Sequence, residues 1–332
     1  MHIISLEDYR KSKRKSYSYI KDFLKDRRKF YKKHVLNEDV EFESTQATRL
    51  GDAADCLLFT PGEFDNRFHV SSVDKTPSGK GLDFIKSLFQ SYRNNPDRFE
   101  DDFVMYAEVA YSEAGLTTPK FENYITKFYN SDMHELLKSW IAAEGKTTLS
   151  HYEASIAHKI KDILVTHPTT SRIFNSEGYG QLSVFFDYDG EEYKAMLDRV
   201  SIDHGNQVIK PFDLKVTYED EGFEYNWLKN YYYIQQGIYE KAIEVWRNEY
   251  FPDYVIDPFR FVVINSDGQS QPLVYEIETD NGSLAEGFIT MRGGNKKGFA
   301  QLARDINWHI NSNIWDVSKD NYDAKNYIRR RI

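Results

Sequence analysis

The spacing of apolar residues changes along the chain, from a helical repeat in the first half to an alternating pattern beyond residue 180. The helical repeat predicts helices over residues 16–34 and 46–59. It continues from 82 to 170, with breaks near proline and glycine. The helices predicted there are 82–93, 97–114, 119–129, 131–143 and 149–165. We therefore expect a large helical insert at about residues 82–165.

The alternating pattern predicts strands joined by tight turns. Residues 182–198 form a hairpin that turns at Asp189-Gly190, and the turn residues 203–206 lead into a strand at 208–217. The elements that follow are a helix at about 224–250, strands at 260–265 and 271–278, and a helix at about 298–311. Meandering strands, a helix and further strands predict an α/β fold with a mixed central sheet, at about residues 180–280.

Composition limits the class of protein. The chain has 332 residues, of which 40% are hydrophobic and 15% aromatic, so we expect a large core in a single domain over residues 1–332. Cys56 is the only cysteine, which excludes a disulfide framework within the chain and a four-cysteine iron–sulfur or zinc site. No apolar signal region opens the chain and no run approaches membrane-spanning length, so we expect a soluble protein of a reducing compartment with no membrane partner.

The net charge of −9 provides no global basic field for nucleic acid. A local basic groove remains compatible with that charge. The basic residues Arg27, Arg28 and Lys32 crowd one face of the first predicted helix. A solvated amphipathic helix is the simpler explanation for them, and a helix that faces phosphate is the alternative.

Three side chains in the alternating segment suggest chemistry. Asp198 ends one apolar run, and Asp213 and Lys215 lie two residues apart at the end of the next. Residues two apart on a strand point to the same face, so Asp213 and Lys215 should project together while Leu214 faces the core. Two carboxylates suit a hard divalent cation, and with an adjacent ammonium they could hydrolyse a phosphodiester. The alternative is a solvated ion pair at a strand end.

The same residues form an ordered set that resembles the PD-(D/E)XK nuclease superfamily. The set comprises Asp198, then Asp213-Leu214-Lys215, then Gln235 and Tyr239 on the following helix. It is similar in particular to phage exodeoxyribonucleases of the RecE and lambda-exonuclease type, and to their RecB relatives. Two helices extend the similarity. Residues 16–23 look like the family's opening Ser-x-Ser helix, and residues 49–58 look like its Leu-Gly-x-x-x-His helix.

The resemblance implies a restriction-endonuclease-like core and assigns roles to the central residues. Asp198, Asp213 and the Leu214 backbone carbonyl would hold Mg²⁺ or Mn²⁺. Lys215 would orient the attacking water or stabilise the charge that grows on the phosphorane. The cofactor implied is therefore a divalent cation, with no iron–sulfur cluster.

Supporting positions match the family pattern in part. Gln235 and Tyr239 lie on one helix face, where they would position Lys215 or a DNA phosphate unless they are core residues. Asp55 stands where the family motif has histidine, and it is expected as a metal ligand because hard cations favour oxygen. Gln181 stands where a glutamate often begins the first core strand. Its amide could orient a ligand or a metal-bound water but carries no charge, which puts a second metal in doubt rather than catalysis.

We therefore expect a metal-dependent deoxyribonuclease, an exonuclease acting on DNA ends in phage-type recombination, replication or repair. The expected setting is a bacterial cytoplasm, and a phage-encoded protein, a homo-oligomer and a single-strand annealing or recombination partner are all compatible with it. Arg27, Arg28 and Lys32 would line the DNA approach, and the insert at 82–165 would bar closed duplexes. The alternatives are a PD-(D/E)XK endonuclease of restriction or repair type and a catalytically silent DNA-binding module.

Overall fold

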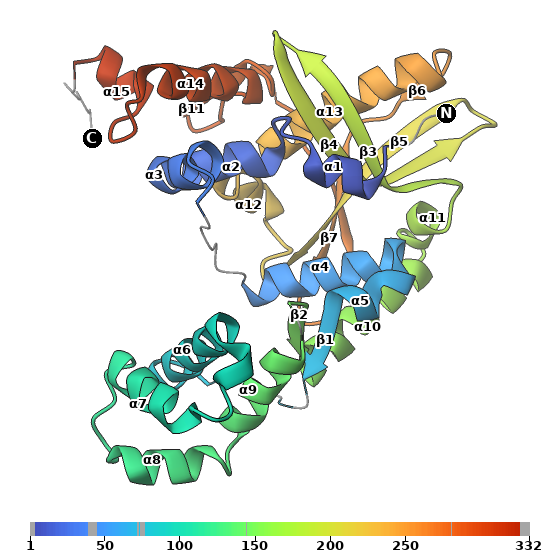
Figure 1. Cartoon of the computed structure of the whole chain (residues 1–332). Coiled ribbons are helices and arrows are strands. Elements are labelled where there is room, and N and C mark those ends of the chain that lie inside the picture. Colours follow the sequence, from blue (N-terminus) through green and yellow to red (C-terminus); the bar gives the residue numbers. More distant parts are fainter. Residues whose placement is uncertain are drawn as a thin grey trace. The chain divides into compact units, whose positions relative to one another are not determined.

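The computed structural model describes residues 4–38, 45–71, 73, 77–143, 145–279 and 281–325. The chain divides into two compact units. Figure 1 shows the whole chain, coloured by residue number. One unit comprises residues 1–44, 163–265 and 270–332, and the other comprises 45–162 with 266–269. The second unit is thus inserted into the first and begins at Thr45, ahead of the insert expected at 82–165. That one domain spans the whole chain stays a prediction.

The first unit is built on a mixed six-stranded sheet, in agreement with the predicted α/β class. The strand order is β3-β4-β5-β7-β8, with β6 paired to β5. The pairs β3–β4, β4–β5 and β7–β8 are antiparallel, whereas β5–β6 and β5–β7 are parallel. The strands are β3 (Gly178–Tyr188), β4 (Glu191–Asp203), β5 (Val208–Thr217), β6 (Val255–Ile256), β7 (Arg260–Asn265) and β8 (Leu273–Glu276).

Both predicted hairpins are present because their turn residues supply the required backbone. Asp189 and Gly190 have φ of 53° and 75°, the left-handed pair that a two-residue hairpin turn needs. In the second turn the Asp203 carboxylate accepts from the backbone N–H of Asn206 at 3.0 Å and from its side-chain amide at 2.9 Å. These two turns fix β3, β4 and β5 as a meander.

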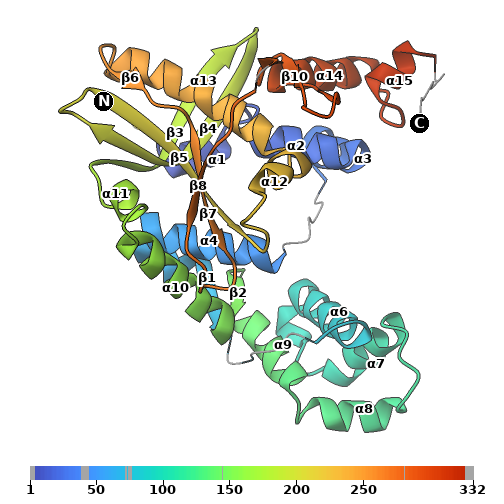
Figure 2. The same ribbon diagram turned by 180° about the vertical axis from the view of Figure 1, so that it is seen from behind.

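Helix α13 (Tyr232–Tyr250) connects β5 to β7 and lies against β3 and β4, as Figures 1 and 2 show from opposite sides. Helices α2 (Tyr17–Lys25) and α14 (Phe299–Ser312) pack against α13. The core between these elements is rich in aromatic residues. Its fully buried aromatic side chains include Phe30, Tyr193, Phe223, Phe261 and Phe299.

Two predicted helices are each divided by a capping or strained residue. The helix expected at 16–34 becomes α2, α3 (Arg27–Phe30) and the π-helical turn η1 (Tyr31–Val35). The division falls at Asp26, whose carboxylate accepts from the backbone N–H groups of residues 28 and 29 and so starts a new helix. The helix expected at 224–250 becomes α12 (Phe223–Lys229) and α13, because Tyr231 takes a left-handed φ of 62°.

Short elements complete the first unit. The N-cap of α2 is Ser16, whose hydroxyl accepts from the backbone N–H of Tyr19 at 3.3 Å. A small three-stranded sheet follows β8 along the chain. The remaining elements are α1 (Leu6–Lys11), α11 (Ser171–Phe174), β9 (Gly282–Ser283), β10 (Gly287–Ile289), β11 (Asn295–Lys296) and α15 (Lys319–Asp323).

The second unit is mostly helical, as predicted. Its elements are α4 (Gln46–Phe59), η2 (Pro61–Glu63), α5 (Phe64–Arg67), β1 (Phe68–Ser71), α6 (Lys80–Asn94), η3 (Pro96–Arg98), α7 (Phe103–Glu113), α8 (Phe121–Phe128), α9 (Asp132–Ala142), β2 (Thr147–Ser150) and α10 (His151–Thr166). The parallel pair β1–β2 was not predicted, because four-residue strands are too short to show alternation. Across the described ranges, no helix has the length and apolar character to cross a membrane.

Candidate active site

Strands β4 and β5 share a ladder over only part of their length. They pair over residues 199–203 and 208–212, after which β5 pairs in parallel with β7. Asp198 in β4 and Asp213 in β5 are the first residues beyond that shared ladder. Lys15 forms a β-bridge with Tyr193 of β4, in the part of β4 that does not pair with β5. The two aspartates therefore lie at a fork between strands, inside each strand rather than at its end as the sequence predicted.

The ladder between β3 and β4 is also interrupted at this level. Gln181 lies opposite Asp198 in the one rung that is missing from the pairing, and it has a φ of 50°. In β4 the core-facing residues Leu197 and Val200 are separated by two positions instead of one. Irregularities of this kind re-aim side chains and are common beside active sites, and a positive φ is uncommon for a residue other than glycine. Gln181 therefore lies on the strand next to Asp198, directly opposite it.

Asp198, Asp213 and Lys215 come together at the fork. The backbone N–H of Leu214, which lies beyond the β4–β5 ladder, donates to Oδ2 of Asp198 at 2.8 Å. Asp213 is fully buried, and its Oδ2 forms an ion pair with Nζ of Lys215. The same Nζ lies 3.5 Å from the carbonyl oxygen of Leu214. One ammonium group therefore contacts oxygen atoms of the strand that also binds the Asp198 carboxylate.

Helix α13 supplies two more polar side chains to this cluster. Nε2 of Gln235 donates to Oδ1 of Asp213 at 2.7 Å and to the Tyr239 hydroxyl at 3.1 Å. Both residues are buried. A buried carboxylate is costly unless its oxygens are bonded, and here each oxygen of Asp213 has a donor. The sequence suggested that Gln235 positions Lys215 or a DNA phosphate unless it is a core residue; the structure bonds it to Asp213, the partner of Lys215.

The environment of Lys215 keeps it charged. Its Nζ lies 4.9 Å from the ring centroid of Tyr232 and 5.9 Å from that of Phe261. Burial acts to lower the pKa of Lys215, but the charges of Asp213 and Asp198 outweigh burial and the pKa is raised. Lys215 is therefore an ammonium at neutral pH, able to donate and to attract anions but unable to accept a proton.

Residues from the N-terminal helices border the same cluster. Tyr17 and Lys21 belong to the helix that resembles the family's Ser-x-Ser helix, but the sequence assigned no site role to them. Burial, with a smaller contribution from Asp198, raises the pKa of Tyr9 to about 12. Nζ of Lys21 lies 5.0 Å from the ring centroid of Tyr17 and 5.7 Å from that of Tyr232. The one available signal was the spacing of Tyr17 and Lys21, four residues apart on one helix face.

The donor atoms at the fork suit one hard cation. They are all oxygens, from the carboxylates of Asp198 and Asp213 and the carbonyl of Leu214. Proteins usually hold Mg²⁺ through one or two carboxylates, with water in the other positions. Within the described ranges, no three His, Cys, Asp or Glu side chains form a metal-binding group. The oxygen donors present at the fork therefore fit a magnesium-type ion that keeps several waters.

Other predicted residues lie elsewhere. Asp55 is half-buried on α4, in the second unit, and its role as a ligand stays a prediction. Arg28 and Lys32 are exposed on α3 and η1. The charge of Arg27 acts on His309 of α14, whose pKa is lowered mainly by burial and to a smaller extent by Arg27. A contact of these three cations with DNA likewise stays a prediction.

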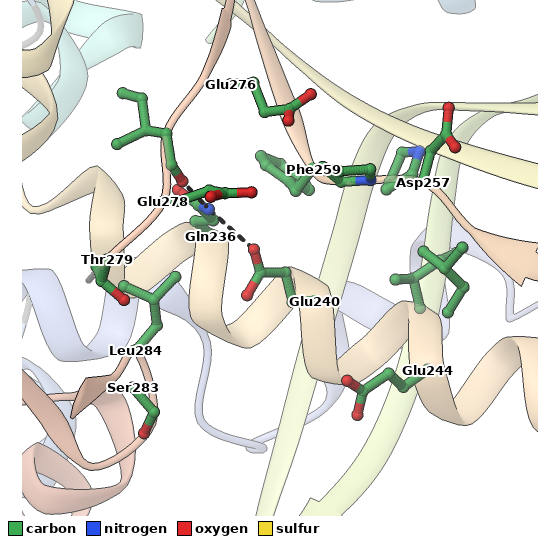
Figure 3. A pocket seen from close by; sticks show the side chains of 15 residues that line it. Gln236, Glu240, Glu244, Asp257, Phe259, Glu276, Glu278, Thr279, Ser283 and Leu284 are labelled. Atoms are coloured by element: carbon green, nitrogen blue, oxygen red, sulfur yellow. Dashed lines mark hydrogen bonds between the residues drawn. The ribbon is translucent and has the colours of Figure 1, made fainter. Parts of the chain in front are cut away.

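A cavity of about 480 Å³ lies beside another face of α13, and none of the predicted site residues lines it. Figure 3 shows its lining, in which Gln236 donates to the Glu240 carboxylate at 2.8 Å and to the Ile277 carbonyl at 2.9 Å. Five carboxylate side chains line it, from Glu240, Glu244, Asp257, Glu276 and Glu278. A cavity with this charge repels a polyanion, so we do not assign a nucleic-acid site to it.

No protein-family model matches this sequence, and no curated protein matches it either. Among solved structures, one match is the crystal structure of a "Putative exonuclease" from Eubacterium rectale. The TM-score is 0.46 and the sequence identity 15%, and the match covers 100% of this chain and 96% of the other. Similarity at this level does not establish a shared activity, so the case for a function rests on the residues at the fork.

Proposed function

We propose that the fork between β4 and β5 is the active site of a metal-dependent nuclease with a PD-(D/E)XK-type core, which hydrolyses phosphodiester bonds in DNA. The observation that carries this proposal is the buried Asp213, bonded to Gln235 and paired with Lys215 where Asp198 reaches the same strand. A buried ion pair is weak evidence for stability, because desolvation offsets most of the attraction. A second carboxylate beside it is better explained by cation binding.

Asp198, Asp213 and the Leu214 carbonyl are the groups proposed to hold Mg²⁺ or Mn²⁺. The chemistry supplied by a bound ion would be polarisation of the phosphate and activation of a water molecule. Asp55 is proposed as a further ligand on the family pattern alone. Gln181, opposite Asp198, is proposed to orient a ligand or a bound water through its neutral amide.

The protein's own groups would stabilise the charge that develops on the phosphate. Lys215 presents a fixed ammonium, held by Asp213 and by the ring of Tyr232. A preorganised donor of this kind contributes roughly 10²–10³ to kcat in other enzymes. Burial and the charges of Asp213 and Asp198 raise the pKa of Tyr239 well above its usual value, so its hydroxyl stays neutral and holds the Gln235 amide in place.

Action on DNA ends, in phage-type recombination, replication or repair, is the form of this activity that we propose. It is supported by the resemblance of the ordered motif to phage exonucleases. One observation favours a second candidate, a silent DNA-binding module: both oxygens of Asp213 are already bonded to protein donors. A metal would then have to compete with Lys215 for the Asp213 carboxylate.

Digestion of end-labelled linear DNA and of covalently closed circular DNA tests the proposal. We expect loss of label from the linear duplex with Mg²⁺ or Mn²⁺, none with EDTA, and much slower cutting of the circle. Equal rates on both substrates would replace the exonuclease with an endonuclease. Binding of DNA with no hydrolysis in either metal would favour the silent module.

Matched variants link the activity to the fork. Asp213→Asn and Lys215→Met keep the size of each side chain while removing its charge, and each should abolish hydrolysis. Asp187→Asn removes an exposed carboxylate from the same sheet, and it should leave the rate unchanged. Full activity in a folded Asp213 or Lys215 variant would overturn the assignment.

A further inference from the structure

Lys21 is a half-buried cation on the face of α2 that borders the fork. Its Nζ contacts the rings of Tyr17 and Tyr232, at 5.0 and 5.7 Å from their centroids. The ring of Tyr232 also contacts Lys215, whose Nζ is 4.9 Å from the same centroid. Two ammonium groups therefore converge on one aromatic ring.

Among the residues that the structure describes, Lys21 forms no ion pair with a carboxylate. The adjacent Asp22 is committed elsewhere, because its Oδ2 pairs with Lys33 at 2.9 Å and with His34 at 3.0 Å. Among the described residues, the contacts of the Lys21 ammonium are the two rings, with no ion pair. Lys215, in contrast, is neutralised by Asp213.

The positive charge of Lys21 is costly in the free protein. Burial, together with the charges of Lys25 and Lys215 and against an opposing effect of Asp22, lowers the pKa of Lys21 from 10.5 to about 8. Two ring contacts of about 0.5–1 kcal/mol each compensate only in part. A charged group that is destabilised by its neighbours in this way is typical of a position that binds a ligand of opposite charge.

We propose that Lys21 and Lys215 together form a phosphate-binding subsite, in which Lys21 binds a phosphate of the nucleic-acid strand that lies at the fork. The inference rests on the proposed function for the identity of the strand, but the subsite itself is defined by phosphate. An anion between the two ammonium groups would relieve their mutual repulsion. Lys21 is accordingly a binding residue, distinct from the exposed cations Arg28 and Lys32.

The alternative is that Lys21 only packs on the aromatic rings. Covalent labelling of the native protein separates the two roles without any substitution. Below pH 8 we would measure the rate at which an amine-specific acylating reagent modifies Lys21, by mass spectrometry of the peptides. The rate is compared in sodium chloride, in inorganic phosphate of equal ionic strength, and with a short DNA duplex in EDTA.

The expected result is that phosphate and DNA each slow acylation of Lys21 several-fold, while Lys25, exposed on the same helix, reacts at an unchanged rate. No protection by either ligand would overturn the subsite. Protection by phosphate but not by DNA would keep the subsite and contradict the proposed nucleic-acid substrate. These outcomes separate a failure of the subsite from a failure of the proposed function.

Binding measurements on variants provide an independent test. Lys21→Met keeps the apolar stem, and it should weaken DNA binding in EDTA about tenfold and reduce the slope of log K against log salt by roughly one. Lys21→Arg should restore the slope, and Lys25→Met is the matched control. A Lys21→Met protein that folds and binds like the wild type would contradict the proposal, as would an equal loss in Lys25→Met.

Discussion

Replacing Lys21 with methionine should make the protein more stable while it weakens the proposed phosphate subsite. The ammonium of Lys21 is half-buried, it lies near Lys215 and Lys25, and its ring contacts are with Tyr17 and Tyr232. Asp22 on the same helix attracts it weakly. Methionine has a similar length and no charge, so it removes the repulsion while it retains the contacts of the stem.

The size of the effect follows from the shift in the pKa of Lys21. The pKa falls from 10.5 to about 8 on folding, and each unit corresponds to about 1.4 kcal/mol. The full shift therefore sets an upper limit of about 3 kcal/mol on the penalty at neutral pH. Loss of the two cation–π contacts offsets about 1–2 kcal/mol of that gain. We expect Lys21→Met to increase the free energy of unfolding by about 1–2 kcal/mol at pH 7.

The sign of the pH dependence is fixed by the same shift. Between about pH 8 and 10.5 the unfolded chain still binds the proton that the folded protein has lost, so the wild type gains stability relative to the variant as the pH rises. The advantage of Lys21→Met is therefore largest below pH 8 and shrinks toward pH 10.5. Lys25→Met, an exposed change on the same helix, should alter stability by less than about 0.5 kcal/mol.

Urea unfolding followed by tryptophan fluorescence measures this difference. Four of the five tryptophans, Trp227, Trp246, Trp308 and Trp315, lie in the first unit, so the signal reports mainly on the unit that contains Lys21. Titrations at pH 7 and near pH 9.5 give the difference in each condition. A variant less stable than the wild type at pH 7, or a difference that stays constant with pH, would refute the reasoning.

Three further changes test other contacts. Gln235→Leu removes the 2.7 Å donor to Oδ1 of the buried Asp213. The free energy of unfolding should therefore fall by about 1–3 kcal/mol, and unchanged stability would mean that water replaces the amide. Gly237→Ala should lower the free energy of unfolding by about 1–3 kcal/mol in urea titrations, because the added Cβ would lie 2.7 Å from Cβ of Leu284. An increase in the free energy of unfolding would show that the loop containing Leu284 can move. Asp26→Ala removes the cap of α3 and should lower the free energy of unfolding by about 1 kcal/mol, whereas Asp26→Asn should retain most of that stability. Equal stability of the wild type and both variants would contradict the capping role.

Local turn chemistry explains which parts of the fold could be predicted. Asp189-Gly190 has few alternatives to a tight hairpin turn, and the spacing of Asp213 and Lys215 places two polar side chains on one face of a strand. The division of the first helix at Asp26 was also encoded locally, by an aspartate that can cap a new helix, but the apolar spacing continued through it. The left-handed Tyr231 had no such signal, because tyrosine does not favour positive φ.

The parts of the site that could not be predicted depend on contacts distant in sequence. The fork between β4 and β5 arises because β5 exchanges one partner for another, which no single strand encodes. The motif left Lys215, a DNA phosphate or the core as surroundings of Gln235, and only the fold brings its amide to Asp213. Lys21 was not among the cations singled out from the sequence, because only its packing against Tyr232, more than 200 residues away in the chain, distinguishes it.

An acidic chain can bind a polyanion if positive charge is concentrated where the substrate contacts the protein. The net charge is −9, yet at the fork the formal charges of Asp198 and Asp213 are balanced by those of Lys215 and Lys21. A divalent cation bound to the two carboxylates would make that region positive. Because the Debye length is about 10 Å at 0.1 M salt, exposed acidic groups farther than this from the fork are largely screened from a bound phosphate. The charge that governs binding is therefore the local one, and the charge of the whole chain governs mainly the rate of encounter at low ionic strength.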